Sequence, residues 1–293
     1  MNNFVLYATT VIVWGSSWLA IKYQLGVVAP EVSVAYRFIL AAIVMLVFCA
    51  ATKRRLRFGR ADHLRMAFQG VLLFGTNYIL LYHASQYLTT GLVAVIFSTV
   101  VVMNIVGTAI LFRQPIPGRV AVGGLLGLNG IVLVFWQDLL NFDLSSDASL
   151  GLALALAGTL AASLGMLSSA LYQKRGLPVI ETTSISMAYG ALYMVAVALL
   201  TGKPFVMDTS PLYVGTLIFL AVFASVIGFC SYLTLLGRIG ADRAAYATVL
   251  FPIIALTLSV VFENFHWTPL ALAGTALILL GNIFILKKQK TDP

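Results

Sequence analysis

The chain has 293 residues, 60% of them hydrophobic and only 10% charged, and its formal net charge is +8. A soluble domain has about 45–50% apolar and about 25% charged residues, so this composition excludes a soluble enzyme, a disordered chain and a secreted disulfide scaffold. The Lys and Arg residues lie in short segments between long apolar ones, which indicates an integral protein of the lipid bilayer and no nucleic-acid partner.

Long apolar stretches follow one another along the whole chain. A helix needs about 20 such residues to cross a hydrocarbon core about 30 Å thick. The ten stretches that qualify are residues 4–24, 31–51, 65–84, 89–112, 118–136, 151–173, 182–201, 212–236, 241–262 and 268–286. Most are too long for the strands of a membrane barrel, and they lack period-two alternation. The sequence therefore predicts an all-α polytopic membrane protein with ten transmembrane helices.

The basic residues predict the orientation of these helices. With the amino terminus inside, the inner segments hold fifteen Lys and Arg residues, whereas the outer loops hold only Lys203. Cytoplasmic loops carry the excess of positive charge in membrane proteins. We therefore expect a multi-pass protein of the cytoplasmic (inner) membrane with both termini in the cytoplasm. The first stretch lacks a basic start and a cleavage site, so we expect a retained helix and not a signal peptide.

An internal repeat is visible in the order of the helices. The acidic linker 137–150 separates a first half, residues 1–136, from a second half, residues 151–293, and each half has five predicted helices. The segment 111–124 also aligns weakly with 261–274. Because five is odd, the second half enters the membrane in the opposite orientation. Inverted repeats of this kind recur in secondary transporters, with the substrate site between the halves.

Several motifs resemble one known family. They are WGSSWLAIK (14–22), the stretch from Pro30 to Arg37, LFPIIALTLSVVFEN (250–264) and LAGTALILLGN (272–282). These segments resemble the ten-helix drug/metabolite transporter superfamily, and in particular its bacterial amino-acid and metabolite exporters, including aromatic amino-acid exporters.

The resemblance implies a fold and a function. It implies two inverted five-helix repeats around a central cavity, with packing roles for the stretches 118–136 and 268–286. It also implies the helices that line the cavity, which are 4–24, 65–84, 89–112, 151–173, 212–236 and 241–262. Pro252 and Glu263 match the family pattern, whereas the equivalent positions of the first half, Val102 and Arg113, depart from it.

Aromatic and polar side chains on these helices are candidates for substrate contact. Trp14 and Trp18 lie four residues apart, mid-helix and on one face, beside small polar residues. A cavity wall and packing between helices both remain open as explanations. The predicted substrate-binding residues are Trp14, Trp18, Asn77, Tyr78, Tyr82, Tyr232 and Tyr246. Trp136 and Trp267 instead fall where an interfacial aromatic belt belongs.

Four further residues form a predicted outer charge cluster or gate: Lys22, Arg37, Pro252 and Glu263. Lys22 and Glu263 could also simply reach headgroups or water. Arg37 lies deeper and needs a partner, and Glu263 is the nearest carboxylate by depth. Pro252 removes a backbone donor and predicts a kink that could serve as a gate. With no carboxylate at midplane, we expect a neutral, aromatic cavity and no Asp or Glu proton relay.

The sequence lacks the motifs that would indicate ATP binding or a metal site. There is no GxxxxGK[ST] motif for ATP and no HxxxH metal spacing, so we expect no cofactor and no metal. The sequence thus predicts a secondary transporter, not an enzyme, that exports amino acids or similar metabolites by alternating access. A cationic drug exporter is the alternative, and an integral membrane lipid-linked transferase is an alternative of another class. The GxxxG at 123–127 favours packing within a monomer, with a dimer left open.

Overall fold

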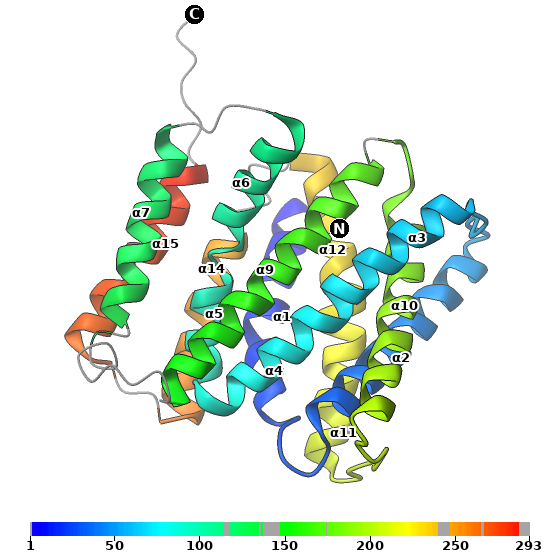
Figure 1. Cartoon of the computed structure of the whole chain (residues 1–293), viewed down its shortest axis with the longest axis horizontal. Helices are drawn as coiled ribbons and strands as arrows, with labels where there is room; N and C mark the ends of the chain where they lie inside the picture. The colour runs from blue at the N-terminus through cyan, green and yellow to red at the C-terminus, as the bar shows by residue number, and fades with distance from the viewer. Residues whose placement is uncertain are drawn as a thin grey trace, which may run out of the picture.

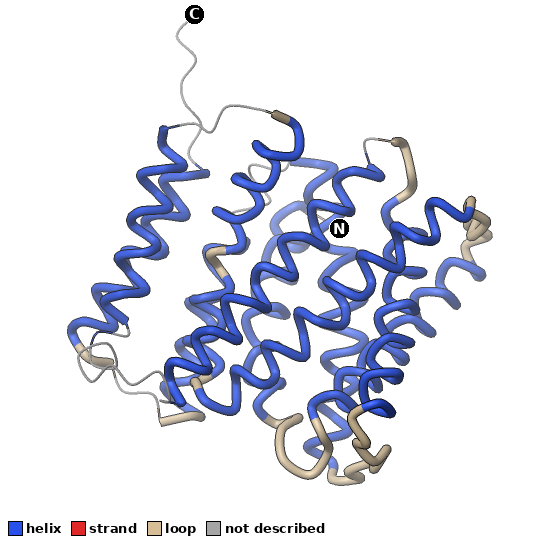
Figure 2. The backbone as a smooth tube through the Cα atoms, viewed as in Figure 1, coloured by secondary structure: helices blue, strands red, loops and turns tan. Residues whose placement is uncertain are grey.

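A computed structural model describes residues 2–113, 118–134, 136, 147–173, 175–239, 247–264 and 267–286. These residues are almost entirely helical, and no strand occurs among them (Figure 2). Tyr246, one of the predicted site residues, lies outside the described ranges, as does most of the predicted linker 137–150. The division into two halves at that linker therefore stays a prediction.

The described residues of the first half form eight helical elements. They are α1 (Asn3–Lys22), α2 (Pro30–Ala51), α3 (Arg60–Gln69), η1 (Gly70–Thr76), α4 (Asn77–Tyr87), α5 (Thr90–Phe97), α6 (Val100–Phe112) and α7 (Gly118–Val134). The second half contains α9 (Asp147–Gln173), α10 (Val179–Leu200), α11 (Pro211–Ile218), η2 (Phe219–Ile227), α12 (Gly228–Ile239), α14 (Ala247–Phe262) and α15 (Pro269–Leu286).

These elements account for all ten predicted membrane segments. Seven helical stretches are long and apolar enough to cross a membrane, and three shorter apolar helices occupy Val122–Val134, Leu250–Phe262 and Pro269–Phe284. The all-α polytopic fold class is confirmed. Local signals agree with the helix starts, since Pro30 and Pro211 each occupy the first turn of a helix, where the missing N–H costs nothing.

The two halves pack through equivalent contacts. The second helix of each half packs against its counterpart, α2 against α10, and the fifth does the same, α7 against α15. Figure 1 shows the α7–α15 pair at one end of the molecule and α2 with α10 at the other. Between these pairs, α4 packs on α9, and α12 packs in the equivalent way on α1. These equivalent contacts agree with the predicted repeat of two five-helix halves.

Glycines permit the closest of these contacts. A Cβ atom at Gly130 of α7 would lie 2.5 Å from the carbonyl oxygen of Gly274 in α15, and one at Gly281 would lie 2.6 Å from that of Gly123. No side chain fits at such separations, so the two helices approach at backbone distance. The GxxxG segment 123–127 therefore contacts α15 of the same chain.

The third helix of each half changes its winding at midpoint, which the hydropathy pattern does not predict. Residues 70–76 (η1) and 219–227 (η2) form π-helix, between α-helical segments on both sides. π-helix is rare and is frequently found at functional sites. The two segments occupy corresponding positions in the repeats.

The predicted helix 89–112 is broken into α5 and α6. The break falls at Ser98 and Thr99, whose hydroxyls donate to the carbonyls of Val95 and Ile96 at 2.6 and 2.7 Å. Hydroxyls that hydrogen-bond the nearby backbone compete with helix hydrogen bonds. The amide nitrogen of Asn282 in α15 donates to the Ser98 carbonyl and hydroxyl at 3.3 and 3.1 Å, which fixes the break against the opposite half.

The loops define two sides of the molecule. The loop 52–59, which carries Lys53, Arg54, Arg55 and Arg57, lies on the same side as the connection between α9 and α10, at the top of Figure 1. We call this the basic side. The connections between α1 and α2 and between α10 and α11 lie on the opposite side.

Candidate functional site

A small cavity lies at the centre of the helix bundle, where the two halves meet. Its volume is about 70 Å³. Its walls come from α1, α2, η1, α4 and α5 of the first half and from α9, η2, α12 and α14 of the second. A site enclosed by both repeats is the place where an inverted-repeat transporter holds its substrate.

Four of the predicted substrate-binding residues line this cavity, namely Trp14, Trp18, Asn77 and Tyr78. Tyr82, one turn beyond Tyr78, is fully buried behind the wall. Tyr232 does not line the cavity, but its ring packs against Trp14 at a centroid distance of 5.1 Å. The side chains that helical spacing selected on α1 and α4 thus face this cavity, apart from Tyr82, and their contact with a substrate stays a prediction.

The two tryptophans of α1 connect the repeats. Trp18 packs against Phe97 of α5 at 5.5 Å and stacks on Phe251 of α14 at 6.2 Å between ring centroids. Trp14 contacts Phe229 of α12 at 5.5 Å. Phe229 and Phe251 could not be predicted from the sequence, because phenylalanine is so common in this chain that it carries no signal by itself.

The π-helical segment η2 supplies a hydrogen-bond acceptor to the cavity wall. The indole Nε1 of Trp14 donates to the carbonyl of Ala224 at 3.2 Å. A buried indole N–H needs such a partner. The hydroxyl of Ser225, the next residue, donates to the carbonyl of Leu220 five residues back at 3.0 Å, in keeping with the π winding.

Arg37 is the charged residue of the cavity, and its surroundings differ from the prediction. Its side chain is only 2% exposed. The Nε atom donates to the Ser225 hydroxyl at 3.2 Å, and the guanidinium carbon lies 4.3 Å from the centre of the Tyr78 ring. The expected pairing with Glu263 is wrong, and so is the expectation of a neutral cavity wall.

Glu263 instead joins α14 to the start of α5. Its carboxylate accepts hydrogen bonds from the Thr90 N–H at 3.0 and 3.3 Å, from the Thr90 hydroxyl at 2.6 Å and from the Ser259 hydroxyl. The Lys22 ammonium lies 4.0 Å away. A carboxylate at a helix N-terminus satisfies donors that have no partner within the helix. Depth alone suggested Arg37 as the partner of Glu263, but the two side chains leave their helices in different directions.

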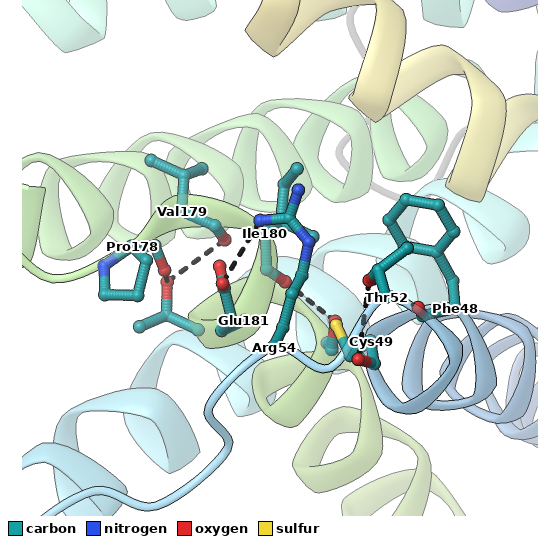
Figure 3. A network of polar contacts seen from close by, with 10 residues as sticks. Phe48, Cys49, Thr52, Arg54, Pro178, Val179, Ile180 and Glu181 are labelled. Carbon is teal, nitrogen blue, oxygen red and sulfur yellow. Dashed lines mark hydrogen bonds and ion pairs between the residues drawn. The ribbon is translucent and has the colours of Figure 1, made fainter.

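Two more carboxylates occupy corresponding positions in the two halves, and one of them, Glu181, joins the halves. Glu31, in the first turn of α2, lies 3.2 Å from Nε2 of His83, on the side opposite to the basic one. Glu181, in the first turn of α10, accepts a hydrogen bond from Arg54 at 3.1 Å on the basic side. Figure 3 shows Arg54 reaching from the loop after α2 to this carboxylate. In the sequence, each of these Glu residues lies within three residues after a proline at the start of its helix, Pro30 or Pro178.

The remaining predicted residues that the structure describes do not line the cavity. Pro252 lies inside α14, next to the cavity residue Phe251. Trp136 and Trp267 are 41% and 39% exposed, in agreement with a place in the interfacial belt. Among the described residues, no group of three or more His, Cys, Asp or Glu side chains could hold a metal ion.

A larger groove of about 890 Å³ lies between α3, α6 and α9. Its walls include strongly exposed apolar side chains, such as Leu64, Phe68 and Ile110. In a chain that crosses a bilayer, exposed side chains of this kind face lipid. The central cavity, and not this groove, is therefore the candidate transport site.

Comparison with known proteins agrees with this architecture. The chain is 25% identical to the uncharacterized transporter YyaM of Bacillus subtilis, over 96% of this chain and 92% of that protein. It is 26% identical to a probable amino-acid metabolite efflux pump of Escherichia coli, over 98% and 96% of the two chains. A protein of known crystal structure shares the fold, with a TM-score of 0.66, 18% identity and coverage of 96% and 95%.

A sequence model of the EamA-like transporter family matches residues 3–136 and 149–287, which together make up most of the chain. The match agrees with the resemblance to the drug/metabolite transporter superfamily that the motifs indicated. The relatives are transporters and not enzymes. The chain belongs to the EamA-like transporter family of multi-pass membrane transporters.

Proposed function

We propose that this protein is a secondary transporter that exports amino acids or similar small metabolites across the cytoplasmic membrane by alternating access. The observation that carries the proposal is the aromatic and polar cavity enclosed between the two halves. The name of the Escherichia coli relative, a probable amino-acid metabolite efflux pump, supports the substrate class and the direction.

The size of the cavity supports a mechanism in which the site opens and closes. A volume of about 70 Å³ is about half that of an engineered cavity of about 150 Å³ that binds benzene. An amino acid needs more space, so the helices must separate before it can bind. The π-helical segments η1 and η2 both contribute to the wall and would adjust during that movement.

Contacts between the halves close the side opposite to the basic one. Glu263 of α14 binds the start of α5, as described above. The side-chain amide of Gln24, just after α1, donates to the Tyr213 carbonyl and the Thr216 hydroxyl of α11 at 2.9 and 2.7 Å. With the basic side in the cytoplasm, as the positive-inside rule requires, these contacts form the outer gate.

The charge of the cavity argues against the alternative of a cationic drug exporter. Arg37 is the charged group that lines the cavity, and none of the described Asp or Glu residues does. A buried guanidinium repels a cationic ligand in a medium of low dielectric constant. We therefore favour zwitterionic or anionic substrates.

Counterflow in proteoliposomes tests the proposal. Liposomes loaded with one unlabelled amino acid should take up the same labelled amino acid, whereas quaternary amines should not exchange. A matched pair of variants connects exchange to the cavity: Ser17 lines it, whereas its neighbour Ser16 does not. Ser17→Phe should fill the cavity and stop exchange, and Ser16→Phe should leave it largely intact.

The proposal fails if the wild-type protein exchanges no amino acid above protein-free liposomes. It also fails if Ser17→Phe, correctly folded, exchanges as fast as the wild type. The direction is tested in cells fed with a dipeptide, where the transporter should lower the internal concentration of the released amino acid.

A further inference from the structure

Arg37 is a buried cation without a buried anion. It lies seven residues after Pro30 in α2, and its side chain is only 2% exposed. No oxygen of a described Asp or Glu residue lies within 4.0 Å of its nitrogen atoms. Removing a guanidinium from water is costly unless an anion and good hydrogen bonds compensate.

The described carboxylates of the membrane region are engaged elsewhere. Glu31 pairs with His83, Glu181 with Arg54, and Glu263 with Thr90, Ser259 and Lys22. At the membrane edges, Asp62 pairs with Arg65, and Asp208 accepts a hydrogen bond from the Ser210 N–H. None of these is placed to neutralise the charge in the cavity.

The present partners of Arg37 do not replace an anion. The Ser225 hydroxyl accepts one hydrogen bond from Nε, at 3.2 Å. The rings of Tyr78 and Phe38 lie 4.3 and 5.3 Å from the guanidinium carbon, which gives cation–π attraction. A guanidinium has five N–H donors, and Nη1 is buried without any hydrogen-bond partner.

Two other buried polar atoms of α4 also lack hydrogen-bond partners. The side-chain oxygen of Asn77, which lines the same cavity, has none, whereas its amide nitrogen donates to the Leu73 carbonyl at 3.2 Å. The Tyr82 hydroxyl lies close to the Arg37 guanidinium but makes no hydrogen bond of standard geometry with it. Buried polar groups in native proteins are nearly always hydrogen-bonded, and unpaired ones need an explanation.

We propose that Arg37 binds the carboxylate group of the transported molecule. The proposal rests on the proposed function and specifies its substrate class: small molecules with one carboxylate and an apolar or aromatic body. The planar fork of a guanidinium matches a carboxylate with two parallel hydrogen bonds. The oxygen of Asn77 can accept from an ammonium group of the same molecule, and Trp14, Trp18 and Phe251 offer an apolar surface to its side chain.

Transport of paired ligands tests this assignment. An amino acid and its carboxamide share the side chain and the amine, and they differ in the carboxylate. The wild-type protein should prefer the amino acid. Arg37→Gln should weaken the apparent affinity for the amino acid about 10- to 100-fold, because a hydrogen-bonded charged partner is lost. The same variant should transport the carboxamide as well as the wild type or better.

Two further variants make the result specific. Lys203→Gln removes a positive charge from an exposed outer-loop position and should change neither ligand's transport. Asn77→Asp introduces a carboxylate into the cavity without a change of shape. It should neutralise Arg37, raise thermal stability and abolish the preference for the amino acid, so it keeps the test informative even if Arg37→Gln does not fold.

A binding measurement separates this inference from the proposed function. In detergent, benzoate or phenylacetate should raise the melting temperature of the wild type relative to chloride at equal ionic strength, and it should not do so for Arg37→Gln or Asn77→Asp. If amino acids are not exchanged but this Arg37-dependent shift is present, the amino-acid function fails and the carboxylate site stands.

Three results would overturn the inference. One is equal transport of an amino acid and its carboxamide by the wild type. Another is an equal loss of both ligands in a folded Arg37→Gln protein, which would show a purely structural role. The third is the absence of both exchange and stabilisation by every carboxylate tested.

Discussion

Replacing Glu263 by Gln should destabilise the fold more than the loss of any exposed charge. The carboxylate accepts from the Thr90 N–H, the Thr90 hydroxyl and the Ser259 hydroxyl, and its side chain is 2% exposed. A hydrogen bond to a charged group contributes about 1.5–3 kcal/mol, against about 0.5–1.5 kcal/mol between neutral groups. Glu263→Gln converts three such bonds into bonds between neutral groups. We therefore expect it to lower the free energy of unfolding by about 3 kcal/mol.

The contribution of Lys22 to this cluster is smaller. Its ammonium lies at the 4.0 Å limit of an ion pair, and its side chain is 46% exposed. Exposed pairs of this kind contribute about 0–1 kcal/mol because water and salt screen them. Lys22→Gln is therefore the matched control, since it removes one charge from the same cluster without removing one of the short hydrogen bonds.

Unfolding titrations with SDS in mixed micelles measure these differences, and a double-mutant cycle locates them. Glu263→Gln and Thr90→Val should be non-additive by about 1 kcal/mol or more, because contacting residues share their interaction energy. If Glu263→Gln unfolds within about 0.5 kcal/mol of the wild type, or no more easily than Lys22→Gln, the assigned link between α14 and α5 is wrong.

Three other experiments test the remaining parts of the structure. A cysteine at Ser146 should react with an impermeant thiol reagent from outside the cell, and one at Gly59 only after permeabilisation; the reverse labelling would contradict the orientation. Trp14→Phe should lower the free energy of unfolding by about 1 kcal/mol through the lost hydrogen bond to η2, and it should alter the exchange rate; unchanged stability and exchange would contradict that role. Gly130→Ala should destabilise the pair α7–α15, measured as a lower melting temperature, whereas Gly127→Ala should be tolerated because a Cβ atom there meets nothing within 4 Å.

Hydropathy predicted the membrane segments well because it depends on composition over about 20 residues. The ends of α1, α2 and α10 fall within three residues of the predicted ones. Helical spacing also predicted the inward face of α1, since Trp14 and Trp18 lie on one side of the helix and both reach the cavity. These inferences use only local geometry.

The charge partners could not be predicted in this way. Sequence position gives the depth of Arg37 in the membrane. It does not give the direction in which the side chain extends from α2. Glu263 lies at a plausible depth, yet it faces α5, and Ser225 of η2 occupies the place beside Arg37. Partners in a helix bundle depend on the rotation of two helices relative to each other, which tertiary packing decides.

The two π-helical segments could not be predicted from the sequence for a related reason. The segment 70–76 reads GVLLFGT and 219–227 reads FLAVFASVI, and neither has a proline or another local signal that separates π- from α-helix. The choice depends on contacts with neighbouring helices. At Gly70, for example, a Cβ atom would collide with the backbone of α10, so the wide turn lies where two helices approach most closely.

The paired π segments have a geometric consequence for the cavity wall. If a wide turn migrates along its helix by one residue, the side chain that it passes rotates by about 100°, which is the angle per residue of an α-helix. The two ends of the helix stay anchored meanwhile. Asn77 follows η1 directly, and Phe229 lies two residues after η2. Such a shift in either π segment would change which side chains face the cavity without moving the whole helix across the bilayer.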